Sequence, residues 1–93
     1  MERRREARMP VRGTGMLSWP EGRINRVEPV EVENVASDGL RVRVNHPLRL
    51  RQIVRLEGPN SSCFALVRYC QRLEEGWAVG LQLAGAARSA YVN

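Results

Sequence analysis

The hydrophobic residues of this 93-residue chain fall in short runs that alternate with polar residues, as in strands with one buried face. Such alternation covers residues 40–44, 52–57, 63–73 and 77–83, and also residues 30–35, the regular part of an irregular extended run over residues 23–35. Another extended run spans residues 11–19, where Gly13 and Gly15 share the parity of Val11 and Leu17 and mark a bulge. We see no repeat, no coiled-coil heptad and no alternation of strands with helices. The pattern predicts six short strands.

Residues typical of turns separate these runs. They are Trp19–Gly22, Asn34–Gly39, Asn45–Pro47, Gly58–Ser62 and Leu73–Gly76. Short strands at fairly regular spacing, joined by turns, are typical of a small antiparallel β-barrel. We therefore expect an all-β fold with a six-stranded antiparallel barrel over residues 11–84. A flexible N-terminal arm over residues 1–10 and a short helical tail over residues 85–93 complete the expected organisation.

Length and composition limit the molecule to one small domain. A chain of this size buries only about 60–65% of its unfolded surface, which allows one core and not two. No apolar run approaches the roughly 20 residues that a membrane-spanning helix requires. The N-terminus is charged and no apolar segment follows it, unlike a signal peptide. We expect a cytoplasmic protein without membrane insertion.

Charge points to anionic partners. The formal net charge is +5 and all 15 cationic residues are arginine. A guanidinium group offers phosphate a planar pair of donors and can stack on a base, whereas lysine offers only a point charge. Residues 1–12 carry five arginines and two glutamates, so this segment contributes +3 of the total.

The residues that most often support catalysis or bind metals are scarce. Cys63 and Cys70 are seven positions apart in one predicted strand, and this odd spacing places them on opposite faces. We therefore expect two reduced cysteines. The single histidine, His46, lies in a predicted turn, so a zinc site is implausible. No nucleophile–base pair or carboxylate pair is apparent. We predict no enzyme activity, no catalytic residue, no metal and no cofactor.

Two short motifs remain. Arg4 and Arg8 form an Arg-x-x-x-Arg pattern in the arm, and Asn34-Val35-Ala36-Ser37-Asp38-Gly39 occupies the turn between the second and third predicted strands. Arg-x-x-x-Arg occurs four times in this arginine-rich chain and means little by itself. In this order and strand context, however, the two motifs resemble those of the PilZ domain family, bacterial receptors for cyclic di-GMP. Residues 79–83 also resemble the closing strand of that family, and the likeness covers roughly residues 3–84.

The resemblance implies a ligand site for cyclic di-GMP. Arg4 and Arg8 would bind phosphate or guanine, and Asn34 would bind a guanine edge. Gly39 would let the backbone approach the ligand. Ala36 stands where the family more often has serine, and the missing hydroxyl should cost about 0.5–1.5 kcal/mol of affinity.

The neighbouring cations Arg3 and Arg5 are further candidates, and Arg3 would favour a stacked pair of ligand molecules. Ordering of the arm would then present a surface to a downstream protein partner, whose identity the sequence leaves open.

Two alternatives stay open. One is a PilZ-like adaptor that binds a protein without ligand, since Ala36 departs from the family pattern. The other is a basic barrel that binds nucleic acid, although we expect no specific nucleic-acid partner. Such barrels need exposed aromatic residues for base stacking. Here Trp19 flanks a predicted turn, Trp77 has an apolar parity, and Phe64 and Tyr69 fall on opposite faces of one predicted strand.

Overall fold

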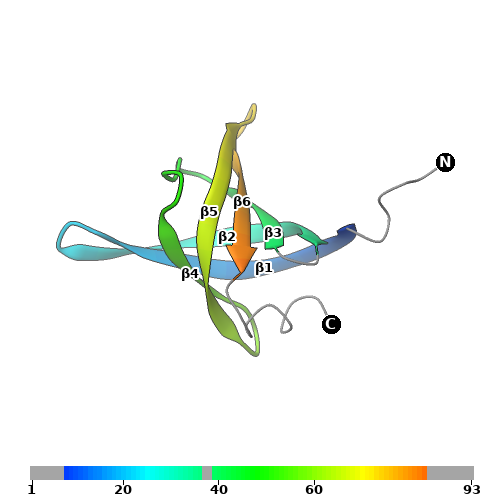
Figure 1. Cartoon of the computed structure of the whole chain (residues 1–93), viewed down its shortest axis with the longest axis horizontal. Helices are drawn as coiled ribbons and strands as arrows, with labels where there is room; N and C mark the ends of the chain where they lie inside the picture. The colour runs from blue at the N-terminus through cyan, green and yellow to red at the C-terminus, as the bar shows by residue number, and fades with distance from the viewer. Residues whose placement is uncertain (1–7, 37–38, 84–93) are drawn as a thin grey trace.

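The computed structural model describes residues 8–36 and 39–83, with residues 8–12 and 36 described by their backbone alone. Six strands form one antiparallel sheet that closes on itself (Figure 1). They are β1 (Arg8–Glu21), β2 (Ile24–Ala36), β3 (Gly39–Val44), β4 (Ile53–Glu57), β5 (Ser62–Arg72) and β6 (Trp77–Leu83). Their order around the barrel is β1-β2-β3-β6-β5-β4. The predicted all-β barrel is confirmed. The predicted helical tail over 85–93 lies outside the described residues.

Strand β1 is longer than the sequence predicted, whereas β2 matches the extended run over residues 23–35. β1 begins at Arg8, three residues before the expected start at Val11, and it continues to Glu21. The two strands form a long hairpin that lies across β4, β5 and β6 (Figure 1). The prediction that Trp19 flanks a turn was wrong, because this residue lies in β1 and is buried in the core.

Three prolines lie inside β1 and β2 without breaking them. Pro10 and Pro20 of β1 each face a residue of β2, and β4 meets β1 only between Met16 and Ser18. Pro29 of β2 likewise lies beyond the part of β2 that β3 pairs with. A strand with a neighbour on one side can accommodate a residue that has no N–H to donate. This explains why proline did not end these strands where the sequence suggested.

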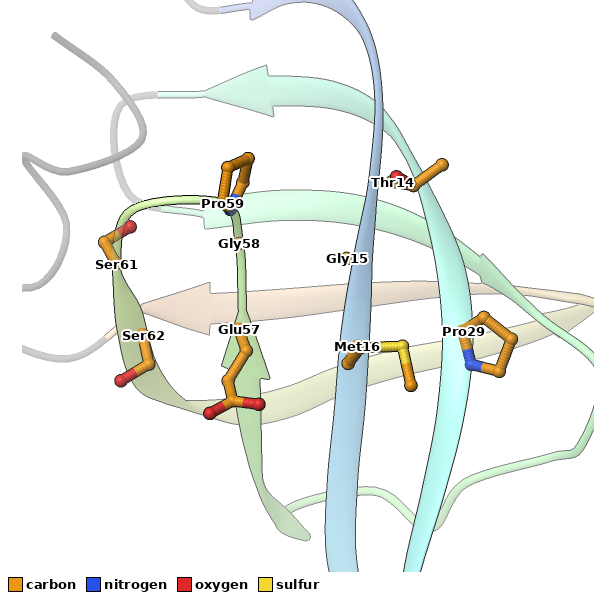
Figure 2. A pocket seen from close by; sticks show the side chains of 9 residues that line it. All are labelled: Thr14, Gly15, Met16, Pro29, Glu57, Gly58, Pro59, Ser61 and Ser62. Atoms are coloured by element: carbon orange, nitrogen blue, oxygen red, sulfur yellow. The ribbon is translucent and has the colours of Figure 1, made fainter.

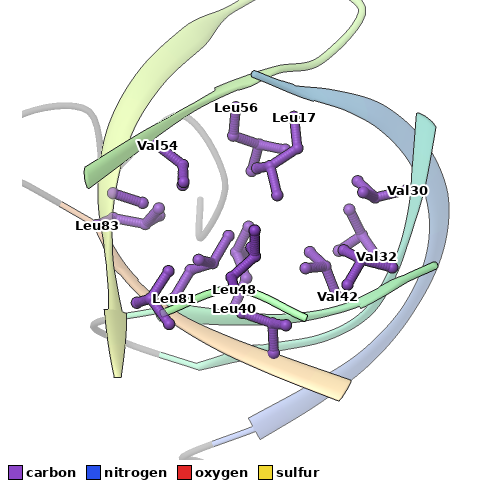
Figure 3. Close-up of a cluster of buried hydrophobic side chains, with 14 of the residues drawn as sticks. Leu17, Val30, Val32, Leu40, Val42, Leu48, Val54, Leu56, Leu81 and Leu83 are labelled. Atoms are coloured by element: carbon purple, nitrogen blue, oxygen red, sulfur yellow. The ribbon is translucent and has the colours of Figure 1, made fainter. Parts of the chain in front are cut away.

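The core fills the inside of the barrel. Inward side chains from all six strands meet there, with Leu48 from the segment between β3 and β4 among them (Figure 3). On β4 the alternation is strict, since Val54 and Leu56 are buried and their neighbours are exposed. Burying branched side chains against one another stabilises the barrel by roughly 1.5–3 kcal/mol for each fully buried residue.

Bulges interrupt three of the strand pairings. The pairing of β1 with β2 shifts between Pro10 and Gly13, as the glycines of this strand predicted. A second shift lies between Val32 and Asn34 of β2. The third lies between Val67 and Tyr69 of β5, where an extra residue reverses the alternation.

The β5 bulge overturns two predictions from strand parity. Phe64 and Tyr69 are both exposed, instead of lying on opposite faces. Cys63 pairs with Leu56 and is buried, and Cys70 packs against the core, so the two cysteines share the inner face. Both remain free thiols.

Candidate functional site

The predicted site residues lie at the junction of β1, β2 and β3. Arg8 is the Cα partner of Ala36 in the β1–β2 pairing, and Pro10 is the partner of Asn34. Directly paired residues of antiparallel strands have Cα atoms about 4.5–5.5 Å apart. The second arginine of the Arg-x-x-x-Arg motif is therefore adjacent in space to the Asn34–Gly39 segment. Arg3, Arg4 and Arg5 lie outside the described residues.

Two cross-strand rows extend from this junction over the outer surface of the barrel. The first runs from Asn34 through Arg41 and Gly80 to Tyr69. The second runs from Ala36 through Gly39 and Gln82 to Leu66. We call the outer surface along these two rows the β2–β3–β6 face. Its residues are Asn34, Gly39, Arg41, Tyr69, Gly80 and Gln82. It continues from β2 across β3 and β6 to β5.

Arg41 is a cation of this face that the sequence interpretation missed. Its Nε atom lies 3.3 Å from Oε1 of Glu33, and Nε of Arg43 lies 3.2 Å from Oε2 of the same carboxylate. The Arg41 Nε is buried and makes no hydrogen bond to any described residue. Two guanidinium groups sharing one carboxylate leave a local excess of positive charge. The sequence did contain a signal, because Arg41 and Arg43 follow the Asn34–Gly39 segment directly. Alternating arginines in a strand are also typical of a solvated face, so the pair was not assigned to the site.

Tyr69 adds an aromatic surface beside Arg41. Its ring lies against the backbone of Gly80, because a Cβ atom at Gly80 would be 2.1 Å from Cε2 of the ring. The residue is nevertheless 42% exposed. A base can stack on such a ring, and the nearby guanidinium can bind phosphate. Only the β5 bulge brings Tyr69 to this face.

Gly39 has a structural role in the sheet, beside the ligand role predicted from the motif. A Cβ atom here would lie 2.2 Å from the carbonyl oxygen of Leu81 on β6. Glycine at this position therefore allows β3 to pack closely against β6. This close packing helps to set the position of β3 in the β2–β3–β6 face.

A large depression in the described surface lies elsewhere. It has a volume of about 660 Å³ and lies where β1 separates from β4 (Figure 2). Its lining residues are Thr14, Gly15, Met16, Pro29, Glu57, Gly58, Pro59, Ser61 and Ser62. Glu57 is the one charged group among them, and there is no cation. This lining suits a doubly anionic ligand poorly, so the depression is not the candidate site.

Other ionisable groups serve the fold. Glu28 is buried, and its Oε2 accepts the Asn45 N–H at 3.0 Å and lies 3.1 Å from Nδ1 of His46. This carboxylate ties the segment after β3 to β2 and gives His46 a structural partner. Burial raises the pKa of the Cys63 thiol, which keeps it protonated. A hydrogen bond and the positive charge of Arg26 lower the pKa of the exposed Glu21.

The described residues contain no cluster of three or more histidine, cysteine or acidic side chains suited to a metal ion. In the same part of the chain, no helix is long and apolar enough to cross a membrane.

A closed six-stranded antiparallel barrel with a cationic outer face beside an arginine motif defines a class of small ligand-binding domains. The family model described as PilZ domain matches residues 2–90. The chain therefore belongs to the PilZ domain family, bacterial receptor and adaptor domains for cyclic di-GMP. No curated protein sequence matches it.

Proposed function

We propose that this domain binds cyclic di-GMP on the β2–β3–β6 face, next to the start of β1. The observation that supports this most strongly is the backbone pairing of Arg8 with Ala36, which joins the two motifs. Arg4 and Arg8 bind phosphate oxygens or guanine, and Asn34 binds a guanine edge. Arg3 and Arg5 are the further cations of this site.

Two residues outside the motifs extend the proposed site. Arg41 follows Asn34 in the same cross-strand row and supplies a guanidinium group close to it. Tyr69 offers a ring face on which one guanine stacks. The missing hydroxyl at Ala36 weakens binding by about 0.5–1.5 kcal/mol and does not abolish it.

The proposed signal is a change in the N-terminal segment. When the ligand is bound, Arg4 and Arg8 hold the segment that precedes β1 against the barrel, and this creates a surface for a protein partner. The domain then acts as a cytoplasmic receptor and performs no reaction of its own.

Calorimetric titration with cyclic di-GMP tests the proposal, with GTP as the ligand control. Arg8→Ala should weaken binding about 10- to 150-fold, the equivalent of the roughly 1.5–3 kcal/mol of a hydrogen bond to a charged group. Arg23→Ala is the matched control, because it removes the same charge from the exposed tip of the β1–β2 hairpin. The stoichiometry separates one bound ligand from a stacked pair. No binding by the folded wild-type protein would reject the receptor function and leave the ligand-free adaptor.

A second candidate, nucleic-acid binding, gains support from the exposure of Phe64 and Tyr69. The sequence had placed these aromatic residues on opposite faces, which left no stacking surface. Titration with a single-stranded oligonucleotide distinguishes the two functions. A steep dependence of affinity on salt and on oligonucleotide length would favour nucleic acid. Saturable binding of one small dinucleotide favours the receptor.

A further inference from the structure

The outer surface of β4 and β5 carries three adjacent apolar side chains. Ile53 is the Cα partner of Leu66, and Phe64 is one step diagonal to Ile53 on the same outward side. Directly paired and diagonal neighbours in a sheet lie within contact distance for large side chains. Ile53 is 56% exposed and Phe64 is 60% exposed. We call Ile53, Phe64 and Leu66 the β4–β5 patch.

The core does not require this patch. The inward positions of the same two strands, Val54, Leu56, Ala65 and Val67, already fill the barrel. Outward positions of a solvated antiparallel strand are usually polar. Isolated exposed apolar residues are common, but contiguous ones mark surfaces that contact another molecule.

Positive charge borders the patch. Arg55 faces Phe64 across the strand pair, and its Nη2 lies 3.3 Å from Oε2 of the exposed Glu57. Arg68 lies two residues beyond Leu66, and its Nη1 donates a hydrogen bond of 2.8 Å to the neutral amide of Gln82. No carboxylate of a described residue lies within 4.0 Å of Arg68.

The turn before β4 adds a third cation. The Arg51 N–H donates to the Val67 carbonyl at 2.8 Å, so this residue lies beside the same end of the patch. Arg51, Arg55 and Arg68 against Glu57 give three positive charges and one negative charge, a net +2 around the apolar centre.

This combination selects the chemistry of the partner. A second copy of the chain would bring the same positive border and a net charge of +5 toward it, and like charges across an interface are unfavourable. A nucleic acid would match the charge, but Ile53 and Leu66 lack the flat ring on which bases stack. A protein segment with an apolar stripe flanked by carboxylates matches both the centre and the border.

We propose that the β4–β5 patch is the docking surface for an amphipathic, acidic segment of a partner protein. The patch adjoins the β2–β3–β6 face through Gln82, which is the Cα partner of both Leu66 and Gly39. The docking surface does not depend on nucleotide binding, so it can be tested with the protein alone.

The test uses two synthetic amphipathic peptides with the same stripe of Leu and Phe, one flanked by Glu and the other by Lys. Heteronuclear NMR titration of the full chain, at low salt and without nucleotide, follows the backbone amides. The Glu-flanked peptide should shift the amides of β4 and β5 saturably and bind at least about tenfold more tightly than the Lys-flanked peptide. Arg68→Glu should remove or reverse that preference.

Phe64→Ser should weaken binding of the Glu-flanked peptide about tenfold or more, in line with the loss of a central apolar anchor. Ile24→Ser is the matched control, because Ile24 is also 60% exposed but lies at the tip of the β1–β2 hairpin. It should leave the affinity unchanged.

Three results would overturn the proposal. The first is equal binding of the two peptides, or shifts centred outside β4 and β5. The second is tighter binding of a single-stranded oligonucleotide to the same amides. The third is a concentration-dependent shift of these amides without peptide, which would identify a second copy of the chain as the occupant. None of these results bears on cyclic di-GMP binding at the other face.

Discussion

Gly39→Ala separates a structural from a ligand-binding role for the last residue of the turn motif. The added Cβ would lie 2.2 Å from the Leu81 carbonyl oxygen and 3.3 Å from its carbonyl carbon. Both atoms belong to the backbone of β6, so no side-chain rotation relieves the contact. β3 and β6 would have to move apart locally by roughly 1 Å, a strain that typically costs 1–3 kcal/mol in a well-packed fold.

For a domain of this size, each kcal/mol lowers the melting temperature by about 4–8 °C. Gly39→Ala should therefore lower it by roughly 4–24 °C in thermal unfolding followed by circular dichroism. Gly13→Ala is the matched control, because a Cβ at Gly13 would meet no atom within 4 Å. That variant should change the stability by less than about 0.5 kcal/mol.

Ligand titration at a temperature where Gly39→Ala is folded completes the test. We expect cyclic di-GMP affinity to fall only as far as the sheet between β3 and β6 is disturbed. An unchanged melting temperature together with complete loss of binding would refute the reasoning, since Gly39 would then act through the ligand and not through β6.

Three further predictions concern the barrel. Glu28→Ala should lower the free energy of unfolding in urea by about 1–3 kcal/mol, because the segment after β3 loses its buried hydrogen-bond acceptor, whereas Glu28→Gln should cost less. Gly80→Ala should destabilise the wild type more than it destabilises a Tyr69→Ala variant, because the new Cβ collides with the ring; equal costs would contradict this contact. The pKa of the Cys63 thiol is higher in the folded protein than in the unfolded chain, where it is about 8.5, so the protonated thiol stabilises the fold below that pH. This stabilisation is lost as the pH rises through the pKa of the folded protein. Urea unfolding should therefore show stability falling more steeply above about pH 8.5 in the wild type than in Cys63→Ala, and parallel profiles would reject this.

Alternation of apolar and polar residues predicted the barrel because each strand has one face in the core. It located five of the six strands within about two residues at most ends, the usual precision of strand boundaries. The exception is β1, which contains two prolines near its ends, Pro10 and Pro20, of the kind that normally end strands. These prolines are accommodated because β1 has a neighbouring strand on one side only at those positions. Which positions lack a second neighbour is decided by the arrangement of the whole sheet.

The candidate site was predictable only in part. Arg8 and Asn34 were assigned to one site from motif order, and the β1–β2 pairing brings their backbones together. Arg41 and Tyr69 were missed for a different reason. They join this face through pairings of β3 with β6 and of β6 with β5, between residues far apart in the chain. Local patterns carry no information about such pairings.

The β5 bulge also determines where β5 can lose a residue in evolution without turning side chains to the wrong face. On its N-terminal side, odd and even positions of β5 have the opposite orientation from those on its C-terminal side. Deleting the single residue Arg68 would place Tyr69 directly after Val67 and restore simple alternation, with Phe64 and Tyr69 still outside and Cys63 and Cys70 still inside. Deleting one residue at a regularly paired position of β5 would instead turn the side chains on one side of the deletion to the opposite face. A change of length is therefore harmless to the two faces of β5 at Arg68, and it exchanges interior and surface at the regular positions.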